Sequence, residues 1–218
     1  MVNDIYGAYS DTPKAQPQPV IEEDIIYADD LEKKHLYKEI EFAVDVEDSV
    51  VYIIGEIEDF GLYDFMVRCR AIIRNRADGD TSPINVIIDS VGGDVYEMFG
   101  IIDYIESLEK NSKIKVNTIC RGKAMSAAAL ILASGTGKRL ASKRSTIMIH
   151  EGSSMQAGKS SDLKAAHKYN SHLEEMANAI LGEKTAKDTK FWSEQSKTDL
   201  YLSAKDAQKL GVIDGIIH

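Results

Sequence analysis

The sequence predicts an α/β protein built around a mostly parallel sheet. Two observations lead to this prediction: apolar strands alternate with helical segments from residue 49 onward, and the strands are apolar on both faces. Such strands are typical of parallel sheets, because the connecting helices pack against both sides of the sheet. The sequence has no internal repeat, so a solenoid or another repeat architecture is not expected.

Runs of apolar and β-branched residues indicate the strands. These runs are bounded by acidic residues, glycines or turn sequences such as Asp78-Gly79-Asp80, which is the usual setting of a short buried strand. The expected strands cover residues 50–57, 84–88, 116–120 and 145–150, and residues 212–217 close the chain.

Apolar residues at helical spacing predict the intervening helices. Residues 125–134 are nearly all small or apolar, which indicates a buried helix, whereas residues 161–181 have one apolar face. Ser203 and Gly211 suit the N-cap and C-cap of a short helix over residues 203–210. Further helices are expected over residues 30–40, over residues 63–73 and from Asp94 to Leu108.

Length and charge divide the chain into two parts. The 218 residues suit one large domain, and 44% hydrophobic residues are enough for a buried core. Residues 1–50 hold 13 acidic residues and 4 lysines, whereas residues 51–218 hold 22 acidic and 22 basic residues, so the net charge of −9 lies at the N-terminal end. We predict an acidic, partly flexible N-terminal segment over residues 1–48, which contains Pro13, Pro17 and Pro19, and a folded domain over residues 49–218.

Composition also excludes several classes of protein. The folded part has no excess positive charge, which argues against a nucleic-acid binder. No apolar run reaches the ~18 residues of a membrane span, and no secretory signal is recognisable, so we expect a cytoplasmic protein. Cys69 and Cys120 are too few for a disulfide framework and lie at no metal-ligand spacing. We therefore expect neither a metal nor a cofactor.

Two junctions between a strand and a helix contain residues that could take part in binding or catalysis. In the first, Gly92 and Gly93 allow a tight turn and a close approach to their N–H groups; the alternative is an ordinary turn. In the second, Ser126 opens a helix of small residues, where unpaired N–H groups suit a developing oxyanion. The alternative for Ser126 is a simple N-cap residue.

A nucleophilic serine requires a base and an acid that orients the base. His150 differs from the other four histidines because it ends an apolar strand, where α/β folds place their sites. A buried structural histidine is the alternative. The acid cannot be chosen from spacing, because the chain has 35 acidic residues.

Several segments, taken in order, resemble the ClpP family, the proteolytic subunits of the Clp protease. The resemblance covers about residues 49–218. The segments are Val51-Tyr-Ile-Ile-Gly-Glu-Ile-Glu-Asp59, Ile88-Asp-Ser-Val-Gly-Gly-Asp94, Gly122-Lys-Ala-Met-Ser126-Ala-Ala, Gly137-Lys-Arg139, Met148-Ile-His150, Asp199-Leu-Tyr-Leu-Ser-Ala204 and Ala207 to Asp214.

The resemblance implies a serine endopeptidase. Matched position by position, Ser126 is the nucleophile, His150 the base and Asp199 the acid. The backbone N–H groups of Gly93 and Ala127 form the oxyanion hole. The substrates are polypeptides, hydrolysed through an acyl-enzyme.

The resemblance also implies an assembly. The fold is of the ClpP/crotonase type, with residues 161–181 as the protruding handle helix. The subunits form a homo-oligomer of stacked rings around an enclosed chamber, into which a AAA+ unfoldase feeds unfolded chains.

The sequence departs from the family in three places. Val91 replaces a proline of the glycine loop, Glu151 and Gly152 follow His150 where glutamine and proline are usual, and the acidic N-terminal segment has no counterpart. These departures would suit a phage-encoded or otherwise divergent member of the family. Three alternatives stay open: a crotonase-type acyl-CoA enzyme, a non-catalytic scaffold subunit, and a peptidase that uses Lys123 as its base.

Overall fold

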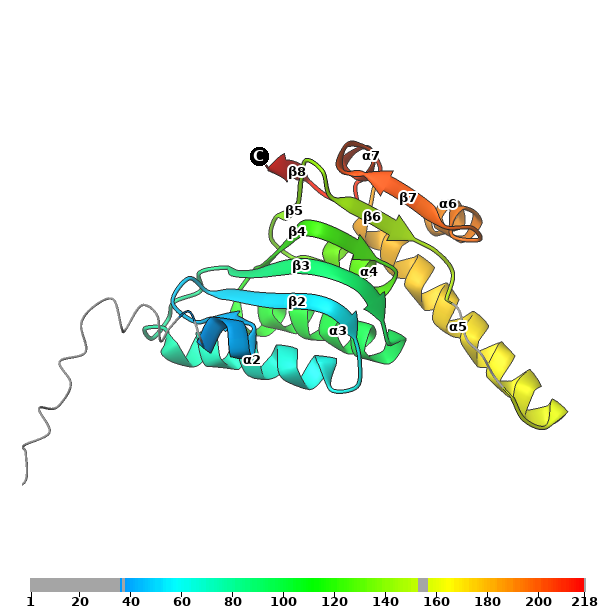
Figure 1. Ribbon diagram of the computed structural model, residues 1–218, viewed down its shortest axis with the longest axis horizontal. Coiled ribbons are helices and arrows are strands. Elements are labelled where there is room, and N and C mark those ends of the chain that lie inside the picture. The colour runs from blue at the N-terminus through cyan, green and yellow to red at the C-terminus, as the bar shows by residue number, and fades with distance from the viewer. Residues whose placement is uncertain (1–35, 37, 153–156, 218) are drawn as a thin grey trace, which may run out of the picture.

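The computed structural model describes residues 36, 38–152 and 157–217. Within them the chain forms a twisted sheet and a layer of helices (Figure 1). The strands are β1 (Val44–Asp45), β2 (Val50–Ile57), β3 (Ile84–Gly93), β4 (Val116–Met125), β5 (Arg139–Ser142), β6 (Thr146–Ile149), β7 (Leu200–Ser203) and β8 (Gly215–Ile217). The helices are α2 (Gly61–Asn75), α3 (Val95–Ser112), α4 (Ala127–Ala133), α5 (Ser160–Lys184), α6 (Thr189–Gln195) and α7 (Ala204–Lys209).

The sheet is mostly parallel, as the sequence predicts. The strand order is β1-β2-β3-β4-β5-β8, and β6 pairs with both β4 and β7. Only the β1–β2 and β6–β7 pairs are antiparallel among the described residues. Strand β4 divides between two neighbours: its first half, Thr118 to Cys120, pairs with β5, and its last residues, Lys123 to Met125, pair with β6.

The long elements match the prediction, but the short elements β5, β7 and α6 were not predicted, and the ends of β3 and β4 differ. Strand β3 continues through Gly93 and strand β4 through Met125, so the two glycine-bearing junctions are strand ends rather than loops. The helix expected from Met125 begins only at Ala127. The helix expected over residues 30–40 lies largely outside the described residues, as does the proline-bearing leader, although residues 38–42 are helical.

The core lies between the sheet and helices α2, α3 and α4. Every residue of α4 is buried, because its small side chains let the helix sit close to β3 and β4. Both cysteines are free and buried. Burial raises the pKa of the Cys69 thiol to about 12, so both cysteines serve as apolar core residues.

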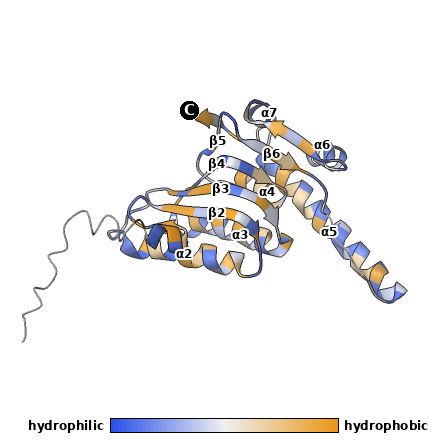
Figure 2. Ribbon diagram, in the orientation of Figure 1, coloured by the Kyte–Doolittle hydropathy of each residue, from blue (hydrophilic) through white to orange (hydrophobic). Residues whose placement is uncertain are grey.

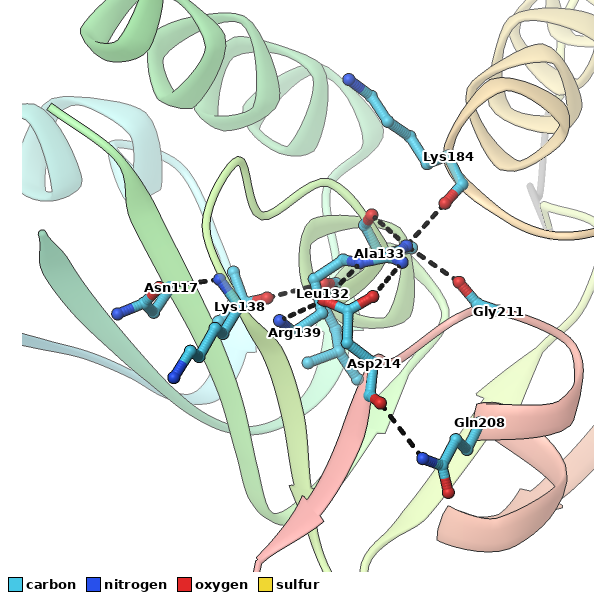
Figure 3. A network of polar contacts seen from close by, with 10 residues as sticks. Asn117, Leu132, Ala133, Lys138, Arg139, Lys184, Gln208, Gly211 and Asp214 are labelled. Carbon is cyan, nitrogen blue, oxygen red and sulfur yellow. Dashed lines mark hydrogen bonds and ion pairs between the residues drawn. The ribbon is translucent and has the colours of Figure 1, made fainter. Parts of the chain in front are cut away.

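Arg139 joins segments that are distant in the sequence (Figure 3). Its guanidinium donates to the main-chain oxygens of Ala133, Lys184 and Gly211 and forms an ion pair with the Asp214 carboxylate. The Arg139 N–H also donates to Asp214, while the Asp214 N–H donates back to the Arg139 carbonyl. The ends of α4 and α5 and the C-terminal segment are thereby fixed to the start of β5.

Helix α5 extends well beyond the sheet (Figure 1). Its only fully buried residues are Leu173 and Leu181, both in its second half. Hydrophilic and hydrophobic residues alternate along it (Figure 2). The second half of α5 therefore packs against the body near α4 and α6, and the first half projects away from it.

Candidate active site

Ser126 and His150 come together because their strands are neighbours. Ser126 follows β4 and His150 follows β6, and the two strands pair in parallel with Met125 opposite Met148. The Ser126 N–H donates to the Met148 carbonyl at 2.8 Å. The carboxyl ends of adjacent parallel strands thus place both residues at the same sheet edge.

Ser126 has an unusual backbone conformation. Its φ of 53° and ψ of −126° lie in a region that L-residues rarely adopt. Although Ser126 precedes the first residue of α4, its side chain makes no capping hydrogen bond. The Oγ atom lies 2.8 Å from His150 Nε2 instead. Ser126 therefore occupies the N-cap position of α4, but its hydroxyl does not cap the helix. A strained turn from strand to helix presents the hydroxyl to the imidazole instead.

Asp199 lies on the other side of the imidazole ring. It immediately precedes β7, which pairs antiparallel with β6 so that Leu200 is opposite Ile149. One carboxylate oxygen lies 3.5 Å from His150 Nδ1. The His150 side chain is 23% exposed and that of Asp199 is 56% exposed. Serine, histidine and aspartate are therefore in sequential contact, although Asp199 is at the outer limit of hydrogen-bond distance.

Gly92 lies against the serine, and Gly93 lies against β2, because neither glycine has a side chain that would obstruct the approach. A Cβ atom on Gly92, whose φ is +92°, would lie 2.5 Å from the Met125 carbonyl oxygen and 2.8 Å from Ser126 Cβ. A Cβ on Gly93 would collide with the Ile57 main chain. Both positions therefore require glycine, which brings the backbone at the end of β3 next to the Ser126 junction.

These residues face one cavity of about 880 Å³. Ser126, Ala127 and His150 line it together with Gly93 and Asp199. Helix α5 forms another wall. Cavities of this size are typical of ligand sites, and this one holds all five residues that the sequence analysis proposed.

An ion pair that the sequence analysis missed connects the two glycine-bearing junctions. The Asp89 carboxylate on β3 accepts hydrogen bonds from both the main-chain N–H and the Nζ of Lys123 on β4. The pairing register of the two strands shifts at this point, so several β4 residues face one residue of β3. Asp89 satisfies an N–H group that the irregular ladder leaves unpaired. A Cβ atom added to Gly122 would lie 2.5 Å from the Asp89 carboxylate. The glycine at this position is therefore the one feature of the sequence that could have indicated the close approach of Asp89.

This ion pair also bears on the alternative that Lys123 is the base. The Lys123 Nζ is 3.0 Å from Asp89, whereas the Ser126 hydroxyl is bonded to His150. The geometry favours histidine as the partner of the serine.

The described residues give no indication of a metal centre or of a membrane-spanning helix. Across residues 36, 38–152 and 157–217, no three His, Cys, Asp or Glu side chains are grouped in a way that would hold a metal ion. Over the same residues, no helix combines the length and apolar character needed to cross a bilayer.

Fold and site together define a class of protein. A serine hydroxyl bonded to an imidazole, with a carboxylate at the other ring nitrogen and a main-chain turn alongside, is the arrangement used by serine hydrolases. Comparison with known proteins narrows this class. A family model described as Clp protease matches residues 44–218.

Curated relatives agree with the family match. The chain is 34% identical over 142 residues, 65% of its length and 71% of the relative's, to ATP-dependent Clp protease proteolytic subunit 1 of Prochlorococcus marinus. It is 30% identical over 173 residues, 79% of its length and 76% of the relative's, to proteolytic subunit 2 of Frankia casuarinae. The chain belongs to the Clp protease family, as the sequence motifs predict.

Proposed function

We propose that the protein is a serine endopeptidase in which Ser126 is the nucleophile, His150 the general base and Asp199 the orienting acid. The observation that carries the proposal is the contact of 2.8 Å between Ser126 Oγ and His150 Nε2. The position of Asp199 beside Nδ1 supports it. The names of the relatives, proteolytic subunits of a Clp protease, support peptide bonds as the substrate.

The mechanism follows from these positions. His150 Nε2 takes the hydroxyl proton as Ser126 Oγ attacks the peptide carbonyl, and Asp199 stabilises the imidazolium that forms. The imidazolium then gives its proton to the departing amine, which leaves an acyl-enzyme. A water molecule, deprotonated by His150, attacks the ester, and the proton returns to Ser126 as the acid product leaves.

Two main-chain groups are proposed to stabilise the oxyanion. Ala127 is the first residue of α4, so its N–H has no partner in the preceding turn of the helix. Gly93 borders the same cavity from the end of β3. In other enzymes, one such donor contributes roughly 2.7–4 kcal/mol to transition-state stabilisation.

We further propose that the chain acts as a subunit of stacked homo-oligomeric rings that enclose the cavity and receive unfolded polypeptides from an unfoldase. The relatives are named as subunits of an ATP-dependent protease, which supports both parts of this proposal. In this scheme the acidic segment 1–48 precedes the peptidase domain 49–218, and its last residues add β1 (Val44–Asp45) to the sheet.

Labelling of the native protein with a fluorophosphonate, followed by peptide mapping, tests the assignment. We expect a single modified residue, Ser126, and a loss of peptide hydrolysis on the order of 10⁶-fold in Ser126→Ala. Ser107→Ala is the matched control, because the Ser107 hydroxyl donates only to the Tyr104 carbonyl within the described residues and does not line the cavity.

Other results would contradict the proposal. A folded oligomer without modification at Ser126 would favour a scaffold subunit. Binding of an acyl-CoA without labelling would favour crotonase-type chemistry. Hydrolysis that persists in Ser126→Ala would exclude the serine as nucleophile.

A further inference from the structure

Helix α5 contributes a carboxylate to the wall of the cavity that contains Ser126. Glu174 lines this cavity and is half-buried, whereas the next residue, Glu175, is exposed and does not line it. Leu173 is buried beside Glu174, and Ala177 lies on the same face of the helix one turn later. The helix therefore turns Glu174 toward the cavity, on a face that carries both apolar and uncharged polar side chains.

The Glu174 carboxylate has no hydrogen bond or ion pair within the described part of the chain. Burial raises its pKa, the nearby charge of Glu151 raises it further, and His167 lowers it. Glu151 lines the same cavity and directly follows His150. The charge of Glu151 thus disfavours the charged form of Glu174, and His167 offsets this only in part. Neither carboxylate forms an ion pair within the described residues, so a positively charged ligand would be attracted to them.

The other acidic residues of the cavity are already engaged. Asp94 accepts hydrogen bonds from the first N–H groups of α3, and Asp199 is paired with His150. Lys197 also lines the cavity, but it forms no ion pair within residues 36, 38–152 and 157–217. Glu174 and Glu151 therefore remain available for a ligand.

A basic side chain of a bound peptide fits this surface. The cavity of about 880 Å³ is large enough to hold several residues of an extended peptide beside Ser126. The apolar residues around Glu174 would cover the methylene groups of a lysine or arginine, while its charged end would reach the carboxylate. A charge-assisted contact in this half-buried setting is stronger than one on the surface.

We propose that Glu174 is a specificity-determining residue, which together with Glu151 selects peptides carrying a lysine or arginine close to the bond that is cleaved. The inference rests on the proposed peptidase function and adds to it a substrate preference. It assigns no chemical step to Glu174, which acts only on binding and positioning of the peptide.

Internally quenched peptides test this preference. In one set, each position from the third residue before the cleaved bond to the third after it carries lysine in turn. A matched set carries norleucine, which has a side chain of similar length and no charge. We expect kcat/KM for lysine to exceed that for norleucine by roughly tenfold at one position or more. The ratio falls toward one in Glu174→Gln, falls in part in Glu151→Gln and is unchanged in Glu175→Gln.

Two outcomes overturn the inference while leaving the peptidase function intact. One is hydrolysis of both sets with no preference for lysine at any position. The other is a preference that is the same in Glu174→Gln as in the wild-type protein. If neither set is hydrolysed but Ser126 is labelled, a lysine-like and a norleucine-like peptidyl phosphonate replace the peptides, and equal labelling rates exclude the preference. Absence of both hydrolysis and labelling contradicts the proposed function itself.

Discussion

Arg139 and Glu174 carry opposite charges in opposite situations. The Arg139 side chain is only 16% exposed, and a carboxylate and three main-chain carbonyls surround its guanidinium. Glu174 is also partly buried, yet its carboxylate has no partner among the described residues and faces a cavity. A charged side chain whose hydrogen bonds and ion pair are formed within the chain, such as Arg139, stabilises the fold. A charged side chain that has no partner and lines a cavity, such as Glu174, can bind a ligand.

Strand β4 connects these two regions. Its first half pairs with β5, which begins at Arg139, and its last residues pair with β6, which leads to His150. The irregular register beside Asp89 and Lys123 separates the halves. One strand therefore anchors the C-terminal segment at one end and presents the proposed nucleophile at the other.

After Ser126→Ala, the largest effect is expected from substitution of Asp199. Asp199→Asn should lower kcat by about 10³–10⁴-fold, because the amide no longer stabilises an imidazolium or fixes the ring tautomer. The free energy of unfolding should stay within about 0.5 kcal/mol of the wild type, since the Asp199 side chain is 56% exposed. Peptide kinetics and urea unfolding measure the two quantities.

Glu194→Gln is the control for this change, because Glu194 is an exposed carboxylate on α6 that does not line the cavity. A loss of activity in Asp199→Asn smaller than tenfold would remove Asp199 from the proposed triad.

The next largest effect is a loss of stability, and it is expected at the Arg139 network. Arg139→Met should lower the free energy of unfolding by about 3 kcal/mol, because Asp214 loses its ion pair and three carbonyls lose their donor. Arg144→Met removes an exposed arginine that has no polar partner within the described residues, and it should change stability by less than about 0.5 kcal/mol. Equal losses in the two variants would contradict a structural role for the Arg139 network.

The sequence predicted the fold better than it predicted these charges. Apolar strands and amphipathic helices have local periodicity, so the parallel sheet was visible in advance. The strands β5 and β7 have four residues each, too few for a pattern, and helix α6 has only seven. All three were missed.

Within the site, local sequence indicated two of the three side chains. Ser126 is predicted because it opens a helix of small residues and His150 because it ends an apolar strand, whereas Asp199 is predicted only through the resemblance to a family. The partners of Arg139 include the carbonyls of Lys184 and Gly211, 45 and 72 residues away, and a carbonyl has no sequence signature. In the sequence, Glu174 resembles any polar residue of an amphipathic helix. Only the packing of α5 against α4 shows that it lines the cavity.

A smaller effect is expected at Asp89, where the irregular register separates the two halves of β4. Asp89→Ala should lower the free energy of unfolding by about 1 kcal/mol, because the Lys123 N–H loses its acceptor. It should lower kcat more than it changes KM, because the ends of β3 and β4 then shift relative to each other. Asp89→Asn, which retains an acceptor oxygen, should restore most of both quantities. Equal defects in the asparagine and alanine variants would show that charge, and not the hydrogen bond, matters at this position.

The smallest effect concerns the pH dependence of stability. Burial raises the pKa of Asp214, but the hydrogen bonds and charge of Arg139 outweigh burial and lower it below its ordinary value. In this case the unfolded chain binds the proton more tightly than the folded protein does. The contribution of Asp214 is therefore fully present above the unfolded pKa of about 3.9 and is lost as the pH falls through the lower folded value.

Arg139→Met removes the side-chain hydrogen bond and the charge, while the main-chain N–H of residue 139 still donates to Asp214. Burial is then opposed by fewer interactions, so the pKa of Asp214 is lowered less and its contribution to stability is smaller. We therefore expect the free energy of unfolding, measured in urea between about pH 3 and pH 6, to decrease more steeply with acid in the wild type than in Arg139→Met. Asp80 and Asp206, whose pKa values hydrogen bonds also lower, are present in both proteins and cancel in the comparison. Arg144→Met should follow the wild-type slope. Parallel slopes in wild type and Arg139→Met would mean that the guanidinium does not control the Asp214 proton, and the contrast with the unpaired carboxylate of Glu174 would lose its electrostatic basis.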